Sequence, residues 1–290
     1  MVYKHLLPWA GCIAWLLTGL TSNAQYYYSD LIATTQSEHK QKLSQTYRVK
    51  KVEEWAILPN GERQTDYRQW TTISPTADTM VQQRLDAGRS TLFTTTYDRL
   101  GKMTTQTERQ PGRVAITRYE RDNNGQIARI ENQLVDTLMV ISSREVHRWT
   151  YDEKGRPLQM WRLVENMDGQ TDSTDVRFTL DTSGLVTEER IYKKGKEFDF
   201  LYYYYNEIGK ITDIVRYNRK WKRLLPDQVF EYDETGKLIQ RMLLTGLREI
   251  SYLIWRYQYD NKGMMIEETL YNNLQQPTGS IRYVYEFYQP

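Results

Sequence analysis

Apolar and polar residues alternate one by one along many stretches of this chain, which is the spacing of a β-strand with one covered face. Residues 255–260, Trp-Arg-Tyr-Gln-Tyr-Asp, are the clearest example. Other stretches carry charges on both faces, as in residues 211–217, where Asp213 and Arg216 fall on opposite sides of a strand. A dry two-sheet sandwich tolerates such charges poorly. The pattern therefore favours one long, strongly twisted or curled antiparallel meander, covered by aromatic pairs and by Lys and Arg stems.

A recurrent turn separates these stretches and is best seen in residues 232–238, Tyr-Asp-Glu-Thr-Gly-Lys-Leu. Asp, two variable residues and Gly form a type I turn that ends in a left-handed residue and joins two antiparallel strands. Gly236 adopts positive φ without a steric clash, and the Asp233 carboxylate accepts a backbone N–H two residues further on. The motif therefore predicts strand, turn and strand.

Copies of this turn recur from residue 97 onward, and their glycines are spaced 24 to 30 residues apart. The glycines are Gly101, Gly125, Gly155, Gly184, Gly209, Gly236 and Gly263, and the aspartates that open the closest copies are Asp98, Asp152, Asp181, Asp233 and Asp260. A second turn signal lies between most neighbouring copies, as at residues 110–113 and 194–196. Each repeat of roughly 27 residues thus holds two strands. The predicted fold is all-β, a repetitive antiparallel β-hairpin meander that forms an elongated, twisted or curled sheet.

Residues 1–24 have the layout of a secretory signal peptide. A basic start precedes an apolar run at residues 13–20, and small residues ending at Ala24 follow this run. The run is too short and wrongly flanked for a stable membrane span. We expect cleavage after Ala24, export to the periplasm or the cell surface, and no membrane span after cleavage.

The remaining chain is expected to form one unit. Residues 25–45 are a polar lead-in segment that can hold a short helix around Ser29 to Leu43. A single β-repeat domain is predicted over residues 46–290, with irregular repeats at 46–96 and regular repeats at 97–290. The last predicted strand, residues 281–287, has no hairpin partner after it and would close or cap the array.

Cysteine and charge narrow the possible chemistry. The only cysteine, Cys12, lies before the apolar run and not at its end, so its lipidation is less favoured than cleavage after Ala24. A chain cleaved there has no disulfide, no thiol nucleophile and no thiolate metal site. Loss of Lys4 lowers the 39 basic residues by one, against 37 acidic residues. The near-neutral balance gives no overall field for nucleic acid or an anionic membrane.

The segments Arg256–Asp260 followed by Gly263, and Arg148–Asp152 followed by Gly155, resemble YD repeats. Such repeats belong to Rhs-type bacterial surface and toxin-shell proteins. The resemblance covers about residues 90–288 and implies an exported β-strand array that encloses or presents something, with carbohydrate-binding or adhesive roles. The chain is much shorter than the shells that wrap a toxin, and nothing after Phe287 resembles a toxin domain, so it looks like a short form of this family.

Residues that could carry out catalysis are few. After the leader only His39 and His147 occur, and both are interpreted as ordinary surface histidines. The pairs Glu188-Glu189 and Glu267-Glu268 could serve a glycosidase, but neighbours on a strand point to opposite faces, so they are interpreted as solvated charges. The aspartates of the turns are caps rather than a calcium ladder, because calcium needs several converging oxygens. We expect no enzyme, no cofactor and no metal site.

One hairpin tip combines cations with aromatic rings. Its candidate ligand-binding residues are Arg216, Tyr217, Arg219, Lys220, Trp221, Lys222 and Arg223. Such a patch can bind a polyanion by charge and by stacking on Trp221, whereas a solvated tip that only aids solubility is the simpler interpretation. The four tyrosines of residues 202–205 suit sugar or protein contacts and equally suit cross-strand packing.

Four functions remain open from the sequence. The favoured one is a non-catalytic envelope or cell-surface module that binds a protein or polysaccharide through its β-repeat surface. The second is an immunity or antitoxin-like partner of a secreted effector, and the third is a hydrolase. The fourth is an outer-membrane β-barrel, which the strand length fits and the charges on both faces oppose.

Overall fold

A computed structural model describes residues 26–289, except residues 137–140, 166–168, 219 and 246–250. One helix, α1 (Ser29–Thr46), precedes 18 strands, so the helix expected around Ser29 to Leu43 is present. The strands are β1 (Val49–Ile57), β2 (Tyr67–Ile73), β3 (Thr79–Asp86), β4 (Arg89–Tyr97), β5 (Met103–Gln110), β6 (Arg113–Arg121), β7 (Ile127–Asp136), β8 (Ile141–Tyr151), β9 (Pro157–Glu165), β10 (Thr171–Leu180), β11 (Val186–Lys193), β12 (Lys196–Tyr205), β13 (Ile211–Asn218), β14 (Arg223–Tyr232), β15 (Leu238–Leu244), β16 (Tyr252–Tyr259), β17 (Met265–Tyr271) and β18 (Pro277–Phe287).

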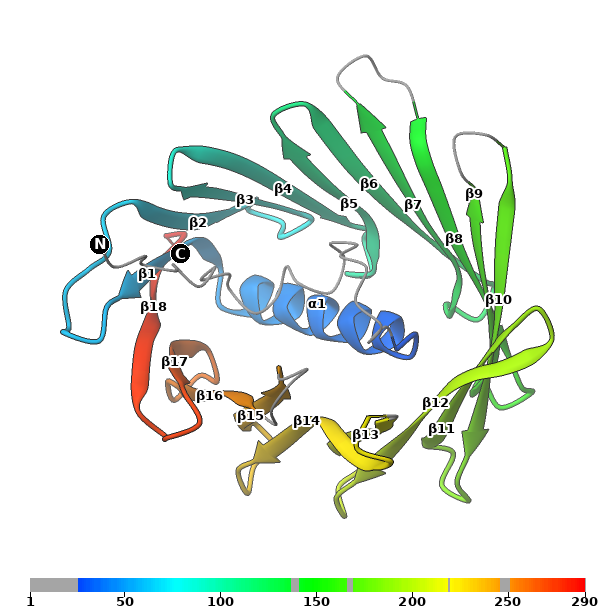
Figure 1. Cartoon of the computed structure of the whole chain (residues 1–290). Helices are drawn as coiled ribbons and strands as arrows, with labels where there is room; N and C mark the ends of the chain where they lie inside the picture. The colour runs from blue at the N-terminus through cyan, green and yellow to red at the C-terminus, as the bar shows by residue number, and fades with distance from the viewer. Residues whose placement is uncertain (1–25, 137–140, 166–168, 219, 246–250, 290) are drawn as a thin grey trace.

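The 18 strands form one antiparallel sheet that closes into a barrel. Each strand pairs with its neighbours in sequence, and β1 pairs both with β2 and with β18, from Val49 opposite Phe287 to Ile57 opposite Ser280. Figure 1 shows the resulting ring, with α1 inside it. The predicted antiparallel β-hairpin meander is confirmed, whereas the predicted elongated sheet is wrong. The reason is cumulative twist and curl, which brings the last strand back to the first and removes both sheet edges.

The recurrent turns have the backbone that their sequence predicts. All seven marker glycines have positive φ, between 72° and 90°. In the first copy, Asp98 Oδ1 accepts the N–H of Leu100 at 2.8 Å and that of Lys102 at 2.9 Å. The same pair of bonds is made by Asp152, Asp233 and Asp260, while Asp181 accepts the Leu185 N–H. Each carboxylate thus satisfies backbone donors that the tight turn leaves free.

In five strands, a tyrosine near the end of the strand links one repeat to the preceding one. Tyr259 donates its hydroxyl to the carbonyl of Leu238 at 2.9 Å, across the neighbouring hairpin. Equivalent bonds run from Tyr151 to Ile127, from Tyr205 to Val186, from Tyr232 to Ile211 and from Tyr285 to Met265. These hydroxyls satisfy carbonyls at the strand starts, which explains why the motif carries Tyr rather than Phe.

Tyr259→Phe is expected to lower the free energy of unfolding by about 1–2 kcal/mol, because the Leu238 carbonyl loses its donor while the ring stays in place. Urea denaturation measures this change. The matched control is Tyr204→Phe, since Tyr204 is half-exposed and should show almost no change. Equal effects of the two variants would contradict the inter-repeat role of the hydroxyl.

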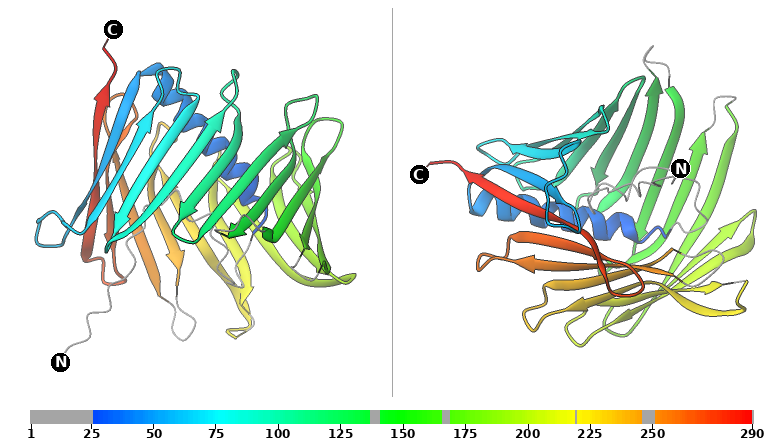
Figure 2. Two further views of the ribbon diagram at one scale, coloured as in Figure 1. Left: turned by 90° about the horizontal axis from the view of Figure 1, so that it is seen from above. Right: turned by 60° about the vertical axis from the view of Figure 1, so that its left-hand side comes forward.

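Apolar side chains gather on the inner face of the wall. One cluster covers β7 to β13 and includes Tyr27, Met160, Val176 and Leu201. A second covers β1 to β5 and the closing strands and includes Ile73. The helix packs against β1 and β5, on the β1–β6 side of the ring (Figure 2). The chain before β1 therefore completes the core from inside the barrel.

Candidate functional site

Residues 26–46, here called the plug, are held inside the barrel by polar contacts with the wall. The first contact is a carboxylate on β11. Glu189 Oε1 accepts the N–H of Tyr27 at 2.8 Å, and its Oε2 accepts the N–H of Tyr28 at 3.0 Å and the hydroxyl of Tyr203 at 2.7 Å. Glu189 is fully buried, and burial raises the pKa of its carboxyl. One wall side chain therefore satisfies two backbone donors of the incoming segment.

Aromatic rings surround this carboxylate. The ring of Tyr28 meets that of Tyr203 edge-on at 5.4 Å and lies 6.1 Å from Phe178, which stacks on Trp149 at 5.3 Å. Tyr26 contacts Gln228 of β14 through its hydroxyl. The start of the plug thus lies among side chains from five strands, β8, β10, β11, β12 and β14, and the aromatic rings shield the Glu189 hydrogen bonds from water.

The second contact is ionic and involves α1. His147 Nδ1 lies 2.6 Å from Asp30 Oδ2, and its Nε2 lies 2.7 Å from Glu145 Oε1. Arg162 also contacts Glu145, with Nη2 to Oε2 at 2.7 Å. Burial lowers the pKa of His147, but Asp30 and Glu145 outweigh burial and raise it from 6.5 to about 9. Burial likewise raises the pKa of Glu145, yet His147 and Arg162 bring it to about 2. His147 is an imidazolium that joins the plug to β8.

The plug should therefore loosen at alkaline pH. The pKa of His147 is raised on folding, so its contribution is complete below pH 6.5 and is lost as pH rises through about 9. We expect the free energy of unfolding to fall by up to about 3 kcal/mol between pH 6 and pH 9.5. Urea denaturation at both pH values measures the fall. In His147→Asn this difference should shrink markedly, and an unchanged difference would contradict the assignment.

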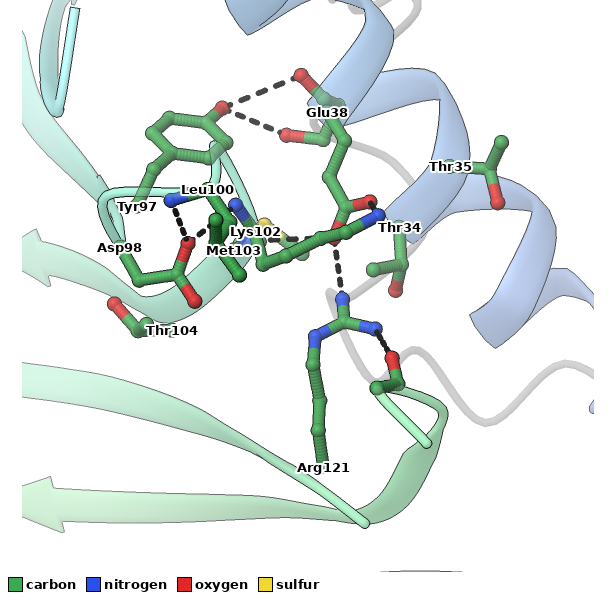
Figure 3. A network of polar contacts seen from close by, with 12 residues as sticks. Thr34, Thr35, Glu38, Tyr97, Asp98, Leu100, Lys102, Met103, Thr104 and Arg121 are labelled. Carbon is green, nitrogen blue, oxygen red and sulfur yellow. Dashed lines mark hydrogen bonds and ion pairs between the residues drawn. The ribbon is translucent and has the colours of Figure 1, made fainter. Parts of the chain in front are cut away.

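The third contact anchors the middle of the helix (Figure 3). Glu38 of α1 receives Lys102 Nζ at 2.9 Å and the N–H of Met103 at 3.2 Å, and it also pairs with Arg121. The β4–β5 turn and the end of β6 thus both bind the Glu38 carboxylate. The hydroxyl of Tyr97 lies 2.9 Å from Ser37 Oγ. In the first Tyr-Asp turn, the tyrosine therefore forms its hydrogen bond with the helix and not with a preceding repeat.

The helix itself is polar, even where it is buried. Its buried residues are Thr34, Gln41 and Ser44, and the neighbouring Thr35 is exposed. A helix that is a permanent part of a core normally buries an apolar stripe. Gln41 Nε2 donates to the carbonyl of Ala77 at 3.2 Å, so this face is held by hydrogen bonds. The plug is thus attached mainly through specific polar contacts along the helix and through tyrosines at its start.

Several sequence interpretations are corrected here. His147 is not a surface histidine, because it is buried between two carboxylates. Glu189 and Glu268 are buried on the inner face and are not solvated charges, whereas Glu188 pairs with Arg190 on the opposite face. Adjacent positions do point to opposite faces, as predicted. The contacts of the plug leave no signal in the sequence, because Asp30 and His147 are 117 positions apart and share no local motif.

The candidate ligand-binding residues 216–223 divide between two faces. Arg216 lies on the inner face opposite fully buried Leu201, where its Nε donates to Asp227 at 2.8 Å and its guanidinium pairs with Asp199. The others described here, Tyr217, Lys220, Trp221, Lys222 and Arg223, are exposed at the β13–β14 hairpin, and Arg219 lies outside the described residues. Of the tyrosines 202–205, Tyr203 belongs to the Glu189 site and Tyr204 faces solvent.

Within the described ranges, no group of three or more His, Cys, Asp or Glu side chains is arranged to hold a metal ion. The expectation of no metal or cofactor stays a prediction. In the part of the chain that the structure covers, α1 is not long and apolar enough to cross a membrane.

No protein-family model and no curated protein matches the sequence. Among solved structures, the chain is similar to a porin-like protein from Bacteroides uniformis, with 11% identity over 82% of this chain and 98% of that one, at a TM-score of 0.43. It is also similar to TcdB2–TccC3 without its hypervariable C-terminal region, with 11% identity, 82% of this chain, 19% of that one and a TM-score of 0.31. A porin-like protein from Bacteroides vulgatus matches at 10% identity, over 82% and 98% of the two chains, with a TM-score of 0.23. The resemblance to YD repeats stays a prediction.

The favoured function from the sequence, a non-catalytic module that binds a protein or glycan through its β-repeat surface, is wrong. It was based on an elongated sheet, whereas β1 and β18 pair and close the sheet into a barrel. The inner face of the sheet is covered in part by the plug. A closed antiparallel barrel with an even number of strands instead fits the architecture of the fourth hypothesis, the outer-membrane barrel.

Proposed function

We propose that the protein is a self-plugged β-barrel of the cell envelope, in which residues 26–46 close the interior and their displacement opens it. The observation that carries this proposal is a polar helix enclosed by a closed wall, with Thr34, Gln41 and Ser44 at its buried positions. Such a helix has little apolar area, so removing it from the interior costs less hydrophobic free energy than removing an ordinary core helix.

The ion pairs that hold the plug can be broken by removing the charge of one partner. Asp30 and Glu38 each pair with wall cations, and both lie on α1. Loss of one partner leaves the other charge partly buried and unpaired, which strongly weakens the attachment. The wall does not depend on these contacts, because its strands are paired to one another around the whole ring.

Cysteine labelling tests the displacement, because Cys12 is the only native cysteine. In the exported protein with Cys12→Ser, Thr34→Cys reports on the plug and Val146→Cys, buried on the outer face of β8 opposite Glu131, reports on the wall. Thr34→Cys should react with a maleimide at least tenfold more slowly than the exposed control Thr35→Cys. Adding Asp30→Asn and Glu38→Gln should speed labelling at position 34 and leave labelling at position 146 unchanged, because displacement of the plug uncovers only the inner face. Equal acceleration at both positions would show that the plug leaves only when the barrel unfolds, which would overturn the proposal.

Closure of the wall favours a second candidate, a barrel that spans the outer membrane. The 18 antiparallel strands are 7 to 11 residues long, near the length that a tilted membrane strand requires. The outer face opposes this candidate, because Arg129, Glu131 and Arg144 form ion pairs across β7 and β8. An arginine at the midplane of the bilayer costs about 2–4 kcal/mol.

Carbonate extraction separates the two candidates. The first candidate, a self-plugged barrel whose outer wall faces water, should be released from envelope membranes by carbonate or high salt. Retention until detergent is added, together with a mobility on gels that changes on heating, would instead favour the membrane-spanning barrel. The labelling experiment remains informative in either case, since it reports on the plug alone.

A further inference from the structure

Exposed apolar side chains gather where β12, β13 and β14 meet their hairpin tips. Phe198, Tyr217, Trp221 and Leu224 are 43, 39, 40 and 44% exposed. They lie on neighbouring strands: Lys193 opposes Lys196 across the β11–β12 tip, Asn218 opposes Arg223 across the β13–β14 tip, and β12 pairs with β13. Phe200 stacks on Tyr217 at 6.4 Å and so continues this apolar surface along the outer wall. We call residues 193–198 and 217–224, without residue 219, the aromatic-basic rim.

The same two tips carry a concentration of cations. The described cations of the rim are Lys193, Lys194, Lys196, Lys220, Lys222 and Arg223. Two of them cover exposed rings, with Lys193 Nζ 4.0 Å from the centre of the Phe198 ring and Lys220 Nζ 5.3 Å from that of Trp221. The rim's one acid on this face, Glu197, is paired with Arg190 at 2.9 Å. The rim therefore has a strong positive charge.

Two other tips at this end of the barrel differ. The β3–β4 turn is balanced by Asp86 and Arg89, and residues 272–276 between β17 and β18 carry no charge. Lysines that serve only solubility need no large apolar partners. Here the cations alternate with exposed aromatic and aliphatic side chains on two adjacent hairpins, which is the composition of a protein surface that lies in the headgroup region of a bilayer.

We propose that the aromatic-basic rim docks the barrel onto the surface of an anionic phospholipid membrane. Trp221 and Phe198 enter the headgroup region, while the lysines around them bind lipid phosphates. Charge complementarity selects this occupant. A second copy of the chain would bring a like-charged rim against this one and repel it. A soluble polyanion could use the cations and the ring of Trp221, but it would have no use for the exposed side chains of Phe198 and Leu224.

Vesicle flotation with the exported protein tests the proposal. The protein should bind vesicles of phosphatidylglycerol and phosphatidylcholine, and should bind pure phosphatidylcholine vesicles at least tenfold more weakly. Lys220→Gln with Lys222→Gln should weaken binding by tenfold or more, since each cation near the surface contributes about fivefold. Trp221→Ala should weaken binding several-fold. The matched control is Tyr204→Ala, which removes an exposed aromatic ring at the other end of β12 and should leave binding unchanged.

Circular dichroism and urea denaturation show whether each variant stays folded, and these rim positions are exposed, so all should. Absence of vesicle binding, or equal binding to neutral vesicles, would overturn the proposal. Binding to dextran sulfate that depends on the lysines and is indifferent to Trp221→Ala, with no vesicle binding, would assign the rim to a soluble polyanion instead. None of these outcomes depends on displacement of the plug.

Discussion

Glu189→Ala should lower the free energy of unfolding by about 3–5 kcal/mol, because it leaves three buried donors without an acceptor. These donors are the N–H groups of Tyr27 and Tyr28 and the hydroxyl of Tyr203. Water cannot replace the carboxylate readily, since Glu189 is fully buried among aromatic rings. Urea denaturation followed by circular dichroism measures the loss. Glu189→Gln should lower the free energy of unfolding by less, because glutamine keeps one acceptor oxygen. Some loss should remain, because its amide NH2 faces groups that are themselves donors.

The adjacent residue is the matched control for this variant. Glu188 lies on the opposite face of β11 and pairs with Arg190 at 2.9 Å near solvent. Glu188→Ala should therefore change the free energy of unfolding by about 1 kcal/mol or less. If Glu188→Ala and Glu189→Ala had equal effects, the Glu189 carboxylate would not be what fixes the plug to the wall.

Arg216→Ala should also cost about 3–5 kcal/mol, because it leaves two acids on the inner face without their cation. Arg216 pairs with both Asp199 and Asp227. Burial raises the pKa of Asp227 and Arg216 opposes this rise, so the pKa of Asp227 should rise further in the variant. Denaturation at pH 5 and pH 8 measures both effects, since protonation of the carboxyl should make the variant's deficit smaller at pH 5.

Arg223→Ala is the control for this second variant. Arg223 belongs to the same run of basic residues but is exposed at the start of β14, so its removal should leave stability almost unchanged. A ligand-binding role shared by the whole run would instead predict similar, small stability effects at both positions. A large effect at Arg216 alone assigns it to the wall rather than to the exposed tip.

Local features of the sequence predicted the repeat well. The turn at each Asp-x-x-Gly pattern depends on one carboxylate and one left-handed residue within five positions. All the interactions that form the turn are therefore local and can be predicted from the sequence. The alternation of side chains then follows from strand geometry, and the opposite faces of Glu188 and Glu189 were predicted on that ground. The burial of Glu189 was not, because two of its three partners, the N–H groups of Tyr27 and Tyr28, lie more than 160 positions away in the lead-in.

The sequence by itself thus determined the hairpin repeat, its turns, the helix before the first strand and the expected export, since each depends on interactions among neighbouring residues or on composition. Only the tertiary structure decided that the sheet closes, that residues 26–46 fill the interior, and which charges are buried. Closure depends on twist summed over 18 strands and on the register of β1 with β18. A charge on a strand has the same local pattern whether it meets water or a plug, and only the closed barrel distinguishes His147 from a surface histidine.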